Sequence, residues 1–303
     1  MQHAHSSAVM RGDPRQAALI GVLLGLAAVG WVLIDRRMSG MDRGPGTDLG
    51  SLGFYVTAWV VMMAAMMFPS IIPMVATYQR VQQARRARGH ALPGATAVFV
   101  GGYLLAWTVF GLAAYALFAL ARGLGSALDG GRVAFYTAGG VLVAAGAYQL
   151  TPFKDACLSR CRSPVRFVME HWRSGVRGAA EMGTRHGLWC IGCCWALMAS
   201  LFALGVMSVA WMLLVAAMIA TEKLLPWKWI AKSTVAVVLV ALGLAVAFVP
   251  SHVPGLTVPD SGTVHDDMQM QGIAAAAGAP GCYPCQANSR KCPFLPVLSN
   301  ASP

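Results

Sequence analysis

Four methionines recur at helical spacing in one long apolar segment of this sequence. The thioethers belong to Met62, Met63, Met66 and Met67. Residues four apart share a helical face, so the four sulfurs form two stacked pairs. Thioether sulfur is a soft ligand that favours Cu(I), although methionine also fills gaps in apolar cores. This segment alone therefore leaves packing and metal binding both open.

A second apolar segment adds thiols and an imidazole to the set of donors. Side chains that can bind a soft metal recur there every three or four residues, at Met182, His186, Cys190, Cys193, Cys194 and Met198. This spacing puts them along one side of a helix. Thiolates favour Cu(I), or Zn(II) when all ligands are thiolates. A stripe of soft donors is harder to explain as packing than a single buried cysteine, so the sequence favours a copper site, with zinc second.

The composition shows which elements must position these donors. Of 303 residues, 57% are hydrophobic and only 12% are charged, whereas about a quarter of the residues in a soluble domain are charged. The composition excludes an ordinary soluble domain and predicts an all-α, polytopic transmembrane helical bundle. About seven spans are expected, at 17–34, 54–78, 95–121, 133–150, 188–205, 208–225 and 231–249.

The fifth and sixth spans are the uncertain pair. Residues 188–220 are almost continuously apolar, and as one helix they would overrun the bilayer by about 20 Å. We expect two short spans with a break near Gly205. A re-entrant hairpin is the alternative.

Basic residues suggest an orientation. Most of the 23 Lys and Arg residues fall on the cytoplasmic side if residues 1–16 form a cytoplasmic arm, so the positive-inside rule places the N-terminus inside and the C-terminus outside. We expect a multi-pass protein of the bacterial inner (plasma) membrane, with a transmembrane domain at 17–249. Topology and anionic lipid account for the net charge of +11, so no nucleic-acid partner is expected.

The segment between the fourth and fifth spans has a different character. Residues 164–182 alternate apolar and basic side chains at helical spacing, which predicts one amphipathic helix in the interfacial layer. Just before it, Cys157 and Cys161 are four residues apart. Because Ser163 and Pro164 interrupt the pattern at once, we interpret these cysteines as packed or solvent-facing thiols rather than as a site.

The last part of the chain, 250–303, is rich in Pro, Gly, Ser and Ala, and we expect a largely disordered external tail. It contains Cys282, Cys285 and Cys292. In an oxidising compartment two of them could pair. A metal-scavenging tail is the equally weighted alternative.

Glu222 and Lys223 end the sixth predicted span. A carboxylate within a span is expensive and tends to be functional, whereas a lysine can extend its ammonium to the interface. Glu222 is therefore a candidate coupling group or half of an interhelical ion pair. Neighbouring residues on a helix do not face each other, so its partner must be a basic group other than Lys223, or a proton.

Together these motifs resemble the DUF2182 family of predicted metal-binding integral membrane proteins of bacteria. The resemblance covers about 54–249 and rests on four stretches, namely 62–69 (MMAAMMFP), 103–107 (YLLAW), 187–194 (GLWCIGCC) and Glu222-Lys223. It implies a membrane protein that binds metal, without an established activity.

We therefore expect a non-enzymatic membrane protein that binds a soft metal ion for transport, delivery or storage at the inner membrane, with copper as Cu(I) the favoured ion and zinc second. The predicted ligands are Met62, Met63, Met66, Met67, His186, Cys190, Cys193 and Cys194. One alternative is a proton- or ion-coupled transporter of a small solute with Glu222 as the coupling group. A second is a non-catalytic assembly subunit of a membrane oxidase, which would have a membrane protein partner.

Overall fold

A computed structural model describes residues 14–38, 51–88, 92–124, 132–205, 208–225 and 227–249. These residues form nine α-helices and no strand, which confirms the all-α prediction. The three cysteines of the tail, and most of the N-terminal arm, lie outside the described residues. In chain order the helices are α2 (Pro14–Met38), α3 (Leu52–Arg86), α4 (Ala95–Leu124), α5 (Arg132–Gln149), α6 (Pro152–Cys161), α7 (Pro164–His171), α8 (Gly175–Leu204), α9 (Val209–Leu224) and α10 (Lys228–Phe248).

Five of these helices are long and apolar enough to cross a membrane, namely α2, α3, α4, α8 and α10. The helices α5 and α6 pass the same test as a pair, with a bend of 68° between them. The helix α9 corresponds to the predicted sixth span but has only 16 residues, about 24 Å at 1.5 Å per residue. By length and composition the described residues thus supply five or six candidate spans, and α9 is shorter than any of them.

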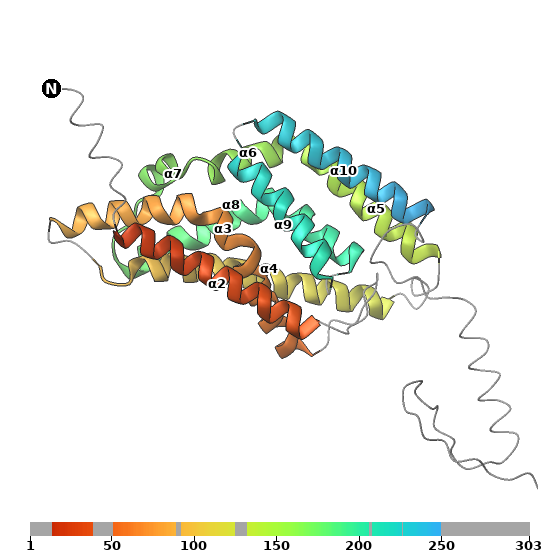
Figure 1. Ribbon diagram of the computed structural model, residues 1–303, viewed down its shortest axis with the longest axis horizontal. Helices are drawn as coiled ribbons and strands as arrows, with labels where there is room; N and C mark the ends of the chain where they lie inside the picture. The colour runs from red at the N-terminus through yellow and green to blue at the C-terminus, as the bar shows by residue number, and fades with distance from the viewer. Residues whose placement is uncertain are drawn as a thin grey trace, which may run out of the picture. The chain divides into compact units, whose positions relative to one another are not determined.

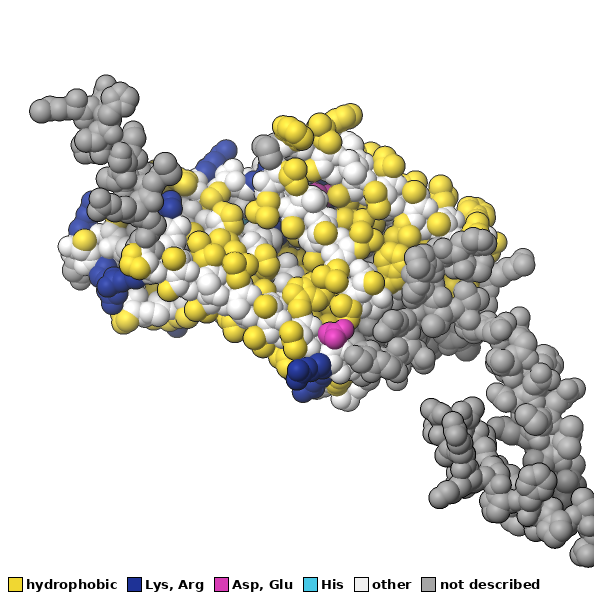
Figure 2. Space-filling model, viewed as in Figure 1, with side chains coloured by type: hydrophobic (Ala, Val, Ile, Leu, Met, Phe, Trp, Pro, Cys, Tyr) yellow, Lys and Arg dark blue, Asp and Glu magenta, His cyan; other side chains and the backbone are white. Residues whose placement is uncertain are grey.

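The helices pack in neighbouring pairs. Within the described unit, α2 lies along α3, α4 along α8, and α5 along α10 (Figure 1). Apolar side chains cover much of the face shown in Figure 2, while Lys and Arg side chains gather near its edges. This distribution is expected for a bundle surrounded by lipid, where the apolar surface faces acyl chains.

The predicted break between the fifth and sixth spans is present. The helix α8 ends at Leu204, and Gly205 follows with φ of +98°. Only glycine adopts this region readily, because a Cβ would clash with the backbone. The chain then reverses into α9, which brings Glu222 and Lys223 back alongside the middle of α8.

The predicted interfacial helix is divided in two. Instead of one helix at 164–182, the structure has α7, which ends at His171, and a separate α8, which begins at Gly175. Trp172 adopts an extended backbone with ψ of 123°, so the helical hydrogen bonds stop there. Residues 175–182 thereby become the first two turns of the helix that carries the cysteines.

Small residues bring α4 and α8 unusually close together. A Cβ built on Gly183 of α8 would lie 2.0 Å from the carbonyl oxygen of Phe99, and one built on Gly102 of α4 would lie 2.4 Å from that of Ala180. Both distances are far below van der Waals contact, so neither position accepts a larger side chain without separating the helices. This close approach places Tyr103 against the cysteine face of α8.

Candidate metal centre

The helix α8 carries three thiols that lie together in the interior. The sulfurs of Cys190, Cys193 and Cys194 all lie within 4.8 Å of one another, and each residue is at most 1% exposed. The Cys193 and Cys194 sulfurs are 3.3 Å apart. We call these three residues the cysteine cluster. It is the one group of three or more His, Cys, Asp or Glu ligand atoms that meets this distance limit among the described residues.

The spacing of the cluster fits a shared metal ion. Metal–thiolate bonds of about 2.3 Å place the sulfurs of a two- or three-coordinate ion about 4.0 to 4.6 Å apart. The observed upper limit of 4.8 Å includes this range, so small side-chain rotations suffice to bind an ion. The donor set, composed of thiols in an apolar interior, suits a soft ion such as Cu(I).

Two polar groups from other helices contact Cys190. The Tyr103 hydroxyl of α4 lies 3.2 Å from the Cys190 sulfur, and the Lys223 ammonium of α9 lies 3.0 Å from it. The same ammonium donates a hydrogen bond of 3.2 Å to the Ser70 hydroxyl of α3. Lys223 therefore points into the bundle instead of extending to the interface, and it supplies positive charge beside sulfurs that become anionic when they bind a metal.

A fourth thiol belongs to the same group. The Cys161 sulfur, at the end of α6, lies 3.8 Å from that of Cys193, although the sequence pattern placed Cys161 outside the site. Cys157, one turn earlier, packs against Gly192, where an added Cβ would lie 2.7 Å from its sulfur. Only one member of the predicted thiol pair thus reaches the cluster.

A buried ion pair ties α6 to α9. The Lys154 ammonium lies 2.6 and 2.7 Å from the two carboxylate oxygens of Glu222, and both side chains are 1% exposed. Arg162, directly after α6, donates hydrogen bonds to the carbonyl oxygens of Glu222 and Leu225, where the last turn of α9 leaves carbonyls without helical partners. We call this set of contacts the α6 latch. It holds Cys161 beside the cluster.

The predicted methionine ligands are buried, but none of them takes part in the hydrogen bonds of the cysteine cluster. All four lie in α3 and are at most 3% exposed: Met62, Met63, Met66 and Met67. Ser70 lies one turn beyond Met66 on the same helical face, and it contacts Lys223 beside Cys190. The Met66 face of α3 is therefore oriented toward the site, about 6 Å along the helix from that contact.

His186 lies one turn before Cys190 and is 2% exposed. Its ring packs against Phe99, Tyr103 and Phe167, with centroid distances of 6.2, 5.8 and 5.3 Å. The Nδ1 atom has no hydrogen-bond partner among the described residues. A buried imidazole nitrogen without a partner is costly, so His186 remains a candidate ligand although it does not belong to the cluster.

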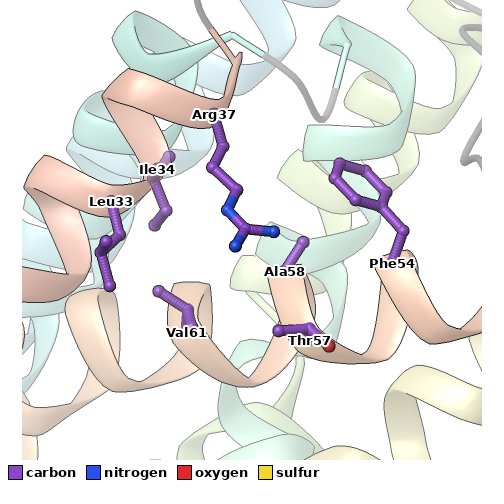
Figure 3. Close-up of a pocket in the computed structure, with 7 residues that line it drawn as sticks. All are labelled: Leu33, Ile34, Arg37, Phe54, Thr57, Ala58 and Val61. Carbon is purple, nitrogen blue, oxygen red and sulfur yellow. The ribbon is translucent and has the colours of Figure 1, made fainter.

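A separate cavity of about 130 Å³ lies between α2 and α3 (Figure 3). Its walls are apolar apart from Arg37 and Thr57, and the Arg37 guanidinium extends into it. None of the predicted metal ligands lines this cavity. The soft-donor chemistry therefore belongs to the interior formed by α3, α4, α6, α8 and α9.

One family comparison agrees with this site. The family model described as "PpoB2: Copper chaperone" matches residues 56–246, more than half of the chain. This range nearly coincides with 54–249, the range of the DUF2182 resemblance; DUF2182 is a related family, and its name is not the one that the match carries. No curated protein and no solved structure matches the chain significantly.

Proposed function

The chain belongs to the PpoB2 copper chaperone family, and on this premise we propose that it binds Cu(I) at the cysteine cluster and delivers it to an acceptor. The observation that carries the proposal is the cluster itself, three buried thiols with all sulfurs within 4.8 Å of one another. Soft, polarizable sulfur in a buried site favours a soft monovalent ion over hard divalent ions. Copper is here the cargo, and no catalytic step is proposed.

The solute-transporter alternative has less support. It requires Glu222 to exchange protons or ions, and a coupling carboxylate needs access to them. The Glu222 carboxylate is instead 1% exposed and engaged by the Lys154 ammonium through both oxygens. This geometry favours a structural role for Glu222 and leaves the thiols as the chemically available groups.

Copper titration tests the proposal directly. The full-length protein, purified in mild detergent under reducing conditions, should bind about one Cu(I) with a thiolate-to-copper absorption band. Binding should weaken as the pH falls, because thiols must lose their protons to become ligands. Zn(II) should compete only weakly. Stoichiometric Zn(II) binding that excludes Cu(I), or no metal binding at all, would contradict the proposal.

We also propose that the protein spans the bacterial inner membrane with its N-terminus in the cytoplasm and delivers copper to a membrane protein. The support is a group of positive charges that the positive-inside rule places in the cytoplasm. It includes Arg173, just before α8, and Arg177, in the first turn of α8. Counting the bent α5–α6 pair and the short α9 as one crossing each gives seven crossings, so a topology reporter fused after residue 250 should show an external location. A cytoplasmic signal from the same fusion would contradict the proposed orientation.

A further inference from the structure

The cysteine cluster is closed to direct contact with a copper donor. Cys190 is 0% exposed, and Cys193 and Cys194 are each 1% exposed. A donor that carries copper on its own thiols must approach within about 2.3 Å of a receiving sulfur. Copper therefore needs an intermediate ligand between the surface and these three thiols.

Cys161 has the properties that such a ligand requires. It is partly buried whereas the other three are buried, so it is the most exposed residue of these four thiols. Its sulfur lies 3.8 Å from that of Cys193, a separation that two ligands of one ion can have. It also lies on α6, a short helix separate from α8, so it can bind copper without any change in the helix that carries the other thiols.

The depth of the cluster supports the same conclusion. The first turns of α8 hold the charged residues Arg177, Glu181 and Arg185. Cys190 follows Arg185 by only about 8 Å along the helix axis, at 1.5 Å per residue. The cluster thus lies near the middle of α8, about two turns beyond its last charged residue, where Cys161 of α6 contacts Cys193.

We propose that Cys161 is the transfer thiol through which Cu(I) passes between a thiolate complex in solution and the buried cysteine cluster. The inference rests on the proposed function and adds the route. In the first exchange, Cys161 forms a Cu–S bond, one donor Cu–S bond breaks, and the proton of Cys161 goes to the released donor thiolate. In the second, Cu–S bonds to Cys193 and to one further thiol of the cluster form, the bonds to Cys161 and to the remaining donor thiolate break, and the protons of the two cluster thiols go to these released thiolates. Copper remains Cu(I) throughout, and no electron is transferred.

The surroundings of Cys161 indicate the chemical class of the donor. Arg160 and Arg162 flank it, with the Arg160 guanidinium 3.9 Å above the Trp189 ring and the Arg162 guanidinium on α9 carbonyls. A Cu(I) ion held by two thiolates carries net negative charge, and positive side chains attract it. Glu170, the one acidic residue of α7, is paired with Arg166 at 2.6 Å and so does not cancel this attraction. We therefore infer an anionic Cu(I)–thiolate complex as donor.

Rates and affinities measured on the same proteins test the transfer thiol. The probe is Cu(I) bound by glutathione, mixed rapidly with the metal-free full-length protein in detergent. Cys161→Ser should slow loading at least about tenfold while lowering the equilibrium affinity, measured against a chromophoric Cu(I) chelator, less than threefold. Cys161→Met should restore part of the rate, because a thioether is still a soft ligand.

Cys157→Ser is the matched control, since Cys157 lies one turn away on the same helix and packs on Gly192 outside the cluster. It should load at the parental rate. An unchanged loading rate in Cys161→Ser would overturn the proposal. So would an affinity loss as large as that of Cys190→Ser, which would make Cys161 a permanent ligand. A parental protein that binds no Cu(I) would instead reject the proposed function, so the two failures are distinguishable.

Discussion

Replacing Cys190, Cys193 and Cys194 together with serine should lower Cu(I) affinity by at least about a thousandfold, or about 4 kcal/mol. A serine hydroxyl has nearly the size of a thiol but is a hard, neutral donor that does not replace a thiolate on a soft ion. The three side chains are buried within one helix, so the fold should survive with modest loss of stability. The measurement is chelator competition on protein that elutes as a single folded species.

The same substitutions separate the two predicted donor sets. If the cluster is the site, the methionines of α3 cannot hold copper alone at comparable affinity, because neutral thioethers bind more weakly than thiolates. Conversely, Met66→Leu, which removes a sulfur but keeps volume, should reduce affinity far less than the triple substitution. Tight Cu(I) binding that survives the loss of all three thiols would move the site from α8 to α3.

Glu222→Gln should destabilise the protein by about 3 to 5 kcal/mol. The substitution keeps the shape of the side chain but leaves the Lys154 ammonium buried without a counter-charge, since both side chains are 1% exposed. The expected result is a strong loss of folded protein from the membrane and a lower thermal midpoint in detergent. The more informative variant combines Glu222→Leu with Lys154→Met, because replacing both charges by apolar groups is often neutral or stabilising.

The control for this prediction lies next to Lys154. Asp155 pairs with Lys232 at 2.6 Å, but its side chain is 47% exposed, so Asp155→Asn should cost less than about 1 kcal/mol. Normal membrane abundance of Glu222→Gln would mean that the carboxylate is not half of a buried pair. If the double variant then folds but loads copper slowly, the α6 latch contributes to loading as well as to stability.

Patterns within one helix were readable from the sequence. The thiols of α8 repeat every three or four residues, which predicted one helical face and the cluster that the structure contains. The break at Gly205 was also predictable, because a continuous helix would have exceeded the bilayer thickness. In these cases the chemistry depends on residues close together in the chain, and helical periodicity determines their relative positions.

Contacts between helices were not readable in the same way. Cys161 and Cys193 are 32 residues apart, and Lys154 and Glu222 are 68 apart. Periodicity shows which side of a helix a residue occupies but not which helix covers that side. Cys161 was discounted because Ser163 and Pro164 follow it, yet these residues only end α6 and leave its last side chain at the cluster. Lys223 was expected at the interface because its sequence does not show that Ser70 and Cys190 face it.

The final turn of α9 bears two opposite charges on neighbouring residues, and they engage different parts of the protein. Glu222 contacts α6 through Lys154, and Lys223 contacts the cluster through Cys190. A displacement of this turn therefore changes both contacts at once. Thermodynamic linkage makes this coupling reciprocal. If packing of α6 against α9 strengthens copper binding by a given free energy, bound copper stabilises that packing by the same free energy. Amide hydrogen exchange in α6 is consequently a measure of copper occupancy at a site that α6 touches through one sulfur.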